Sequence, residues 1–131
     1  MSSRALLFTA CAILACTSVP TATRESTCAL EVSVAHRLAG ALRNLILYEE
    51  SYFADSVNYT SNLAVPQPWL GYPNGFDAGP DVEVVIKDVS PMGWRATAVH
   101  PLKGVRCVVY IGVGPQEIPG MREGEPACET M

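Results

Sequence analysis

The sequence predicts an α+β fold in which one long N-terminal helix packs on a three- or four-stranded antiparallel sheet. Two observations indicate this architecture. Apolar residues recur every three or four positions from about Ala29 to Asp55, which is the spacing of one face of a helix. Further along, between Val82 and Val113, apolar and polar residues alternate in three short segments, the pattern of half-buried strands.

Length and composition indicate one globular domain with a single modest core. The chain has 131 residues, of which 49% are hydrophobic and 17% charged, so it carries enough apolar material to fold. Its formal net charge is −4. A phosphate backbone is bound by basic surfaces, so we do not expect nucleic acid as a partner.

Residues 1–15 have the features of an export signal. Arg4 precedes the apolar run Ala5–Cys16, which is shorter than the roughly 20 residues that a membrane-spanning helix needs. We therefore expect this leader to be removed and the protein to be extracytoplasmic. The stretch Ile13-Leu14-Ala15-Cys16 is similar to a bacterial lipobox, which implies that Cys16 becomes lipidated and attaches the protein to a membrane. Ordinary secretion with cleavage nearby is the alternative.

Residues 16–28 are small, polar and rich in hydroxyl groups, which predicts a tether between the membrane and the folded domain. The domain itself is expected over residues 29–131. The helix follows directly, with Ser26 or Thr27 as its N-cap. At roughly 1.5 Å per residue it is about 40 Å long, so one end should project from a small domain. Its expected apolar face consists of Val34, Leu38, Ala41, Leu42, Leu45, Tyr48, Glu49 and Tyr52.

A connection rich in Pro and Gly follows the helix over residues 61–80 and contains Trp69, Tyr72 and Phe76. These aromatic side chains have two possible roles. They form a contact surface, since aromatic residues are enriched in interfaces, or they fold back to cover the sheet. The length of the connection is typical of loops that are functional or mobile.

Three strands are predicted after this connection. Links over residues 88–93 and 100–104 are short and rich in Pro and Gly, so the strands should be antiparallel neighbours. Ala96 and Ala98 fall on the inner face of the second strand, where their small size lets the helix approach the sheet closely. The inner face is expected to consist of Val82, Val84, Ile86, Trp94, Ala96, Ala98, Val105, Cys107, Val109, Ile111 and Val113.

The cysteines favour one disulfide, between Cys107 and Cys128. These residues enclose a turn-rich segment with little apolar material, and closing a loop of about 20 residues stabilises a domain by roughly 3 kcal/mol in the loop-entropy model. Export makes oxidation plausible. Cys28 is left over as a free thiol, as one half of an intermolecular bridge, or as the true partner of Cys107.

Nothing in the sequence predicts an enzyme, a cofactor or a metal site. Glu49 and Glu50 are adjacent on the helix and point in different directions, so they do not form a facing acid–base pair. Asp77 and Asp81 offer too few oxygen ligands for calcium. The two histidines are isolated and no Cys-x-x-Cys pair accompanies them, which argues against zinc. An enzyme whose residues meet only in space is the least favoured alternative.

Six stretches of the sequence carry a resemblance to a known family. They are Leu42-Arg43-Asn44-Leu45, Glu49–Asp55 and Tyr59-Thr60 near the helix end, Gly93–His100 in the second strand, and Cys107–Gly112 and Gly124–Cys128 in the last strand and closing loop. In this order and spacing they resemble bacterial type IV pilins and pseudopilins. The long apolar helix of these proteins and its Gly-Phe-Thr-like processing site are absent. The resemblance therefore implies a pilin-like headpiece carried behind a lipoprotein-type signal peptide, and not a main fibre subunit.

Together these features predict a non-enzymatic component of the cell envelope that binds other surface, pilus or secretion-system proteins. Fold alone does not establish this function, so it rests on the resemblance and on the lack of a catalytic set. The alternative is an exported binding lipoprotein that holds a small ligand or a glycan with the 61–80 connection.

Overall fold

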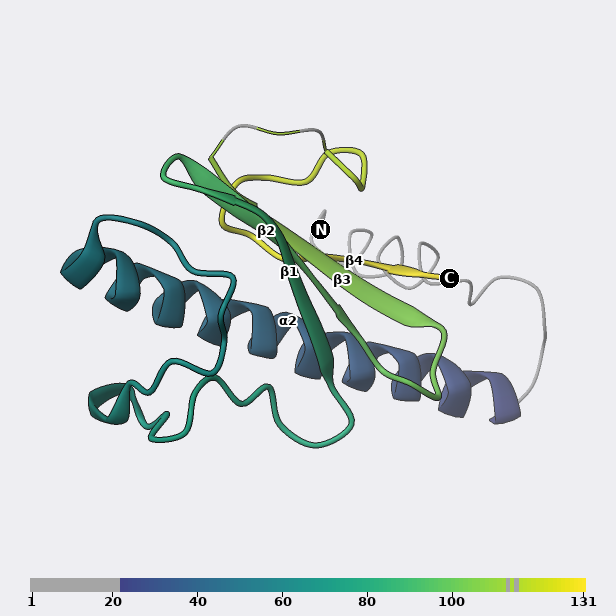
Figure 1. Ribbon diagram of the computed structural model, residues 1–131. Helices are drawn as coiled ribbons and strands as arrows, with labels where there is room; N and C mark the ends of the chain where they lie inside the picture. Colours follow the sequence, from purple (N-terminus) through teal and green to yellow (C-terminus); the bar gives the residue numbers. More distant parts are fainter. Residues whose placement is uncertain (1–21, 113, 115) are drawn as a thin grey trace, which may run out of the picture.

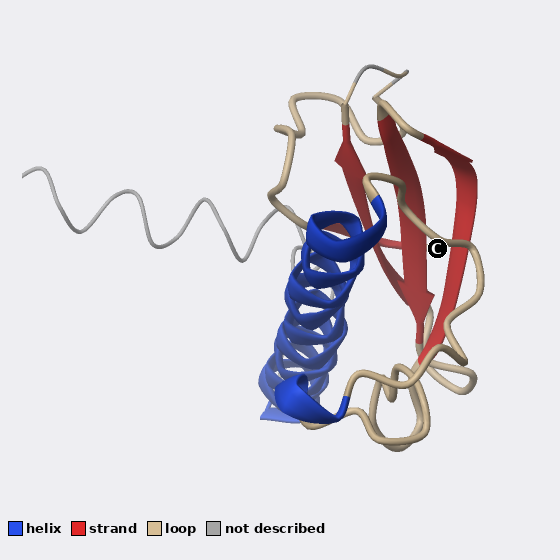
Figure 2. Cartoon of the chain, turned by 60° about the vertical axis from the view of Figure 1, so that its left-hand side comes forward, coloured by secondary structure: helices blue, strands red, loops and turns tan. Residues whose placement is uncertain are grey.

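The computed structural model describes residues 22–112, 114 and 116–131. The predicted leader and the predicted lipidation site, Cys16, lie outside this part of the chain. Its elements are the helix α2 (Ala22–Ser56), the short 3-10 helix η1 (Pro68–Leu70) and the strands β1 (Glu83–Ser90), β2 (Gly93–Val99), β3 (Val105–Ile111) and β4 (Ala127–Thr130). The predicted α+β class is confirmed, with α2 packed along one face of a four-stranded antiparallel sheet (Figures 1 and 2). None of the helices described is long and apolar enough to cross a membrane.

The sheet has the simplest antiparallel topology, because its strand order β1-β2-β3-β4 follows the chain. Val84 pairs with Ala98, Ala98 with Cys107, and Cys107 with Cys128, so these four residues form one row across the sheet. The predicted antiparallel pairing of the first three strands is therefore confirmed, and β4 is the fourth strand.

The helix begins at Ala22, earlier than the predicted Ala29. Residues 22–28, predicted as part of the tether, are helical, so Ser26 and Thr27 lie inside the helix and do not cap it. No Pro or Gly occurs between Thr21 and Gly40, so no helix breaker limits α2 on this side. At the other end the helix stops before Val57, which adopts a left-handed φ of 58°.

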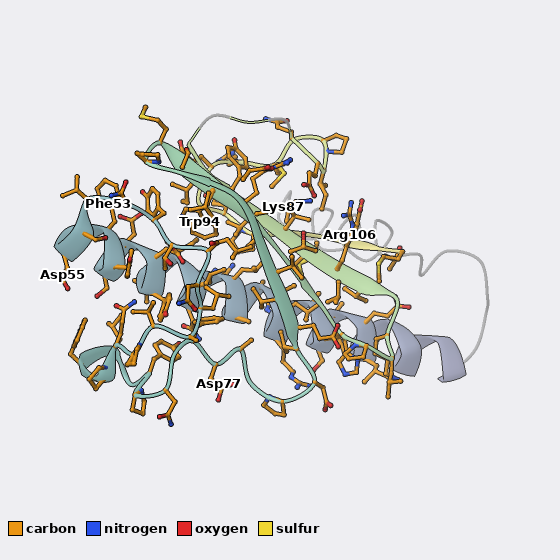
Figure 3. The ribbon with its side chains drawn as sticks, in the orientation of Figure 1. Phe53, Asp55, Asp77, Lys87, Trp94 and Arg106 are labelled. Atoms are coloured by element: carbon orange, nitrogen blue, oxygen red, sulfur yellow. A yellow bond between two sulfur atoms is a disulfide. The ribbon has the colours of Figure 1, made fainter. Side chains whose placement is uncertain are left out.

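The core lies between α2 and the inner face of the sheet. Ala96 and Ala98 are fully buried there, as predicted. Trp94 lies on the same side of the sheet, towards the C-terminal end of α2 and near Phe53 (Figure 3). The buried residues of this core are Val34, Leu38, Ala39, Leu42, Leu45, Tyr48, Trp94, Ala96, Ala98, Val105, Cys107 and Val109.

The predicted disulfide between Cys107 and Cys128 is present and joins β3 to β4. The carbonyl oxygen of Ala35 lies 3.6 Å from Sγ of Cys107 and 3.8 Å from Sγ of Cys128. Bridged sulfurs have no hydrogen to donate, so this is a packing contact that seats α2 on the disulfide. The bond also excludes the alternative pairing of Cys107 with Cys28.

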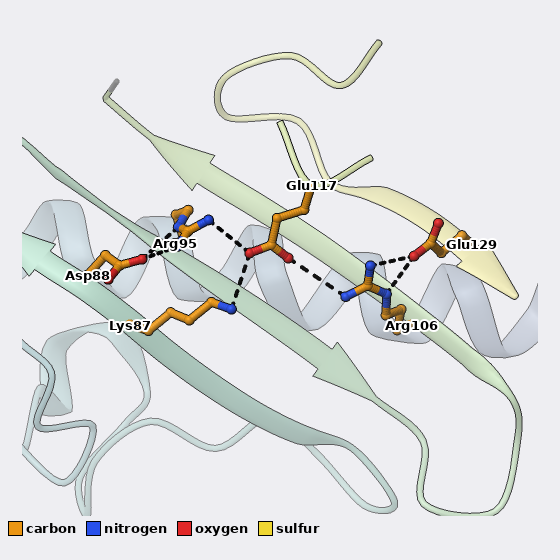
Figure 4. A network of polar contacts seen from close by, with 6 residues as sticks. All are labelled: Lys87, Asp88, Arg95, Arg106, Glu117 and Glu129. Atoms are coloured by element: carbon orange, nitrogen blue, oxygen red, sulfur yellow. Dashed lines mark hydrogen bonds and ion pairs between the residues drawn. The ribbon is translucent and has the colours of Figure 1, made fainter. Parts of the chain in front are cut away.

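A network of ion pairs covers the face of the sheet opposite α2 (Figure 4). Glu117 reaches this face from the segment between β3 and β4, and its carboxylate lies 3.2 Å from Nζ of Lys87, 3.0 Å from Arg95 and 3.7 Å from Arg106. Asp88 pairs with Arg95, and Glu129 with Arg106. The three cations and three carboxylates balance, so the network closes the segment onto the sheet without leaving a net charge.

Candidate interaction surface

Two adjacent residues of α2, Tyr48 and Glu49, hold the connection between α2 and β1. Both side chains are fully buried. Oη of Tyr48 donates a hydrogen bond of 2.6 Å to the carbonyl of Val65, and the carbonyl of Tyr48 accepts one of 3.0 Å from Nε2 of Gln67. Oε2 of Glu49 accepts a bond of 2.9 Å from the backbone N–H of Thr60. The start and the middle of the connection are thus fixed to one turn of the helix.

Tyr72 and Phe76, two of the three aromatic residues predicted to form a contact surface, pack against the core. Their ring centroids lie 5.8 and 5.5 Å from that of Tyr48, in edge-to-face geometry. Gly75 directs Phe76 inward: its φ is +100°, and a Cβ at this position would lie 2.5 Å from the carbonyl oxygen of Leu63. Both side chains are partly buried and pack against the core, in keeping with the covering role considered as the alternative.

Trp69 is placed differently, at the tip of a tight turn. Gln67 and Tyr72 exchange backbone hydrogen bonds of 2.7 and 3.1 Å, and these bonds enclose η1. Gly71 ends η1 with a left-handed φ of 87°, a conformation that glycine adopts without strain. The turn holds the three residues of η1 away from the core, and none of them is buried.

The exposed aromatic ring lies beside α2, with 64% of Trp69 accessible to solvent. Its Nε1 donates a hydrogen bond of 3.0 Å to Oγ of Ser51. Leu47 precedes Ser51 by one helical turn on the same face of α2, and it is 61% exposed. Leu70, next to Trp69 in η1, is 38% exposed. We call Leu47, Ser51, Trp69 and Leu70 the Trp69 patch.

Glu49 is the most perturbed acid described in the structure. Burial raises the pKa of its carboxyl from the ordinary 4.5 to about 7, an effect that the hydrogen bond from Thr60 opposes and the neighbouring Glu50 reinforces. Oε1 of Glu49 is buried and has no hydrogen-bond partner. Burial also raises the pKa of Tyr48 and of Tyr59.

The other residues considered for chemistry do not converge. Asp77 accepts a hydrogen bond from the N–H of Gly79 at 2.9 Å, which closes a local turn. His100 accepts one of 3.1 Å from the N–H of Leu102. Across the described residues, no three His, Cys, Asp or Glu side chains gather in a group that could hold a metal ion.

A cavity of about 230 Å³ lies on the sheet near the turn between β1 and β2, where Asp88, Met92, Arg95 and Tyr110 line it. Trp69 does not line this cavity. The exposed aromatic residue of the 61–80 connection is therefore not part of this cavity.

Sequence reasoning missed two features of the polar chemistry. The helical spacing included Glu49 in the apolar face, but nothing in the sequence indicated that its carboxyl group is fully buried. The ion-pair network joins Lys87, Arg95 and Arg106 to Glu117, and no local pattern in the sequence signals that contact.

No model of a protein family matches this chain, and no curated protein matches it in sequence.

Proposed function

We propose that this chain is a non-enzymatic, pilin-like protein of the bacterial cell envelope that binds other surface or secretion-system proteins through the Trp69 patch. In this proposal residues 1–15 are removed on export, and a lipid on Cys16 attaches the domain to a membrane. Protein partners are the proposed ligands, and no cofactor takes part.

The proposal rests on one observation: Trp69 is exposed to solvent, while a hydrogen bond to Ser51 holds its ring in place. A large aromatic ring that is 64% accessible and yet held by a hydrogen bond to Ser51 loses little conformational entropy on binding. Tryptophan is also the residue type most enriched among those that dominate binding energy at interfaces. Leu47 extends the apolar area along the adjacent face of α2.

The pilin-like part of the proposal is supported by the order of elements. A long helix, an irregular connection, antiparallel strands and a disulfide-closed last strand occur here in the order that the resemblance implies. A family is not established by this order, and the envelope location rests on the leader and on Cys16. The small-ligand alternative receives no specific support at Trp69, because the cavity described above lies elsewhere.

Changing Trp69 to alanine is expected to weaken partner capture strongly while leaving the fold intact. We suggest placing a photo-crosslinking amino acid at position 47 of the full-length protein in its bacterial envelope and identifying the adducts. Loss of a central aromatic residue typically costs an interface 2 kcal/mol or more, so Trp69→Ala should lower the yield of each protein adduct by about tenfold or more.

Val85→Ala is the matched control for this experiment. Val85 is 62% exposed, but it lies on β1, away from the patch, so the adduct yield should remain at the wild-type level. Equal yields from Trp69→Ala and wild type would contradict the proposal. Adducts with a glycan or a small molecule in place of a protein would favour the ligand-binding alternative.

The mass of the purified exported protein tests the other half of the proposal. We expect the mass of a chain that begins at Cys16 and carries acyl groups. Two more cysteines should react with a thiol label after reduction than before it, because reduction opens the disulfide. Mass spectrometry of the intact protein, before and after reduction and thiol labelling, measures all three quantities. A product that retains residues 1–15 would contradict the predicted leader.

A further inference from the structure

One carboxylate is buried at the junction between α2 and the connection that follows it. Glu49 is fully buried, and its two oxygens have unequal surroundings. Oε2 accepts the N–H of Thr60 at 2.9 Å, whereas Oε1 has no hydrogen-bond partner. A buried carboxylate oxygen without a partner is unfavourable when ionised, and protonation removes that penalty.

The groups around Glu49 offer no compensating positive charge. Glu50 and Tyr48 adjoin it on α2, and Tyr59 approaches from the connection, with its hydroxyl 3.1 Å from Glu50. Glu123, from the segment between β3 and β4, acts on Tyr59. Every one of these groups is neutral or negative. Within the described residues, no Lys or Arg forms an ion pair with Glu49.

The position of Glu49 couples its ionisation to the connection. Thr60, which it binds, is itself buried and begins the segment that leads to the Trp69 turn. Oγ1 of Thr60 accepts the N–H of Asn62, whose Oδ1 in turn accepts the N–H of Ala64. Release of Thr60 would therefore loosen a chain of hydrogen bonds that continues to Ala64.

We propose that Glu49 is a pH-sensitive latch, which holds the connection firmly on α2 when it is protonated and weakens that contact when it ionises. The latch is independent of the proposed function, because opening of the junction between α2 and the connection requires no binding partner. Only an effect of the latch on partner binding by Trp69 would depend on that function.

The direction of the effect follows from linkage. Burial raises the pKa of Glu49 to about 7, and opening of the junction to water returns it towards 4.5. A group with a raised pKa in the closed state stabilises that state at low pH, and the contribution disappears as the pH rises to about 7. Between pH 5 and pH 8, opening of the junction should therefore become more frequent by up to about seventyfold.

Two NMR measurements on the unmodified full chain test the latch. The Thr60 amide, bonded directly to the carboxylate, should shift with a midpoint near pH 7. Its hydrogen-exchange protection, corrected for the intrinsic rate, should fall at least tenfold from pH 5 to pH 8. A midpoint near 4.5, or equal protection at both pH values, would overturn the proposal, and neither result depends on whether Trp69 binds a partner.

Glu49→Gln and Glu50→Gln make a matched pair of variants for the same measurements. Glu49→Gln should abolish the transition and make protection of Thr60 independent of pH, because glutamine does not ionise. Glu50→Gln, at an exposed neighbouring position, should retain the transition with its midpoint moved slightly lower. A transition that persists in Glu49→Gln would refute the assignment. Should that variant not fold, the measurements on the unmodified chain still decide the question.

Discussion

Loss of the Cys107–Cys128 disulfide should lower the free energy of unfolding by about 3 kcal/mol. The bond closes a loop with a sequence separation of 21, and the loop-entropy model assigns roughly this value to a loop of that size. The segment inside the loop depends on the bond, because β4 has only four residues and all of them are partly exposed. The contact between the disulfide and Ala35 of α2 would also be weakened.

The double variant Cys107→Ala/Cys128→Ala is the appropriate test, since alanine avoids placing a hydroxyl at the fully buried position 107. Thermal denaturation should show a Tm lower by roughly 10–20 °C for a domain of this size. Cys28→Ser is the control, because it removes a thiol and leaves the disulfide intact. An unchanged Tm in the double variant, or an equal loss in Cys28→Ser, would show that the bond does not stabilise the domain as argued.

Enlarging Ala98 should destabilise the domain by about 2–3 kcal/mol, because overpacking a close contact forces side chains or backbone to move. Ala98 is fully buried on β2 and pairs with Cys107, whose sulfur is 3.6 Å from the backbone of α2. The helix thus passes near the sheet at this row, and leucine would add three carbon atoms there.

Urea denaturation of Ala98→Leu measures this effect, and the m-value shows whether the folded state stays compact. Val85→Leu serves as the control, because it enlarges an exposed side chain on the neighbouring strand and should change stability by less than about 0.5 kcal/mol. If Ala98→Leu were as stable as the wild type, the close approach of helix and sheet at this row would have to be abandoned.

The fold was predictable because its main elements are encoded locally. Leu38, Leu42 and Leu45 mark one helix face by spacing alone, and all three are buried. Alternation likewise identified the inner residues of β1, β2 and β3, although Val113, which was also assigned to the inner face, lies outside the described residues. The predicted start of α2 was wrong. Small hydroxyl residues indicate a tether by composition, yet none of residues 22–28 forbids a helix.

The candidate surface was only partly predictable, because its contacts join distant residues. The sequence marked Trp69, Tyr72 and Phe76 as one group, but their directions depend on the turn at Gly71 and on the approach of Gly75 to Leu63. The pairing of Arg95 with Glu117 spans 22 positions and requires the path of the chain after β3. Periodicity contains no such information.

The early start of α2 has a mechanical consequence. Side-chain burial is described from Leu30 onward, and the first buried residue in this part of α2 is Val34. The part of α2 ahead of Val34, residues 22–33, is roughly 18 Å long, and in Figure 1 this end extends past the turn between β2 and β3. A change in the length of this helical segment alters both the distance and the rotation of the globular body relative to the chain before it. Two residues inserted ahead of Val34 would turn the globular body by roughly 200° relative to the chain before it, whereas four would restore nearly the original azimuth and add about 6 Å of height.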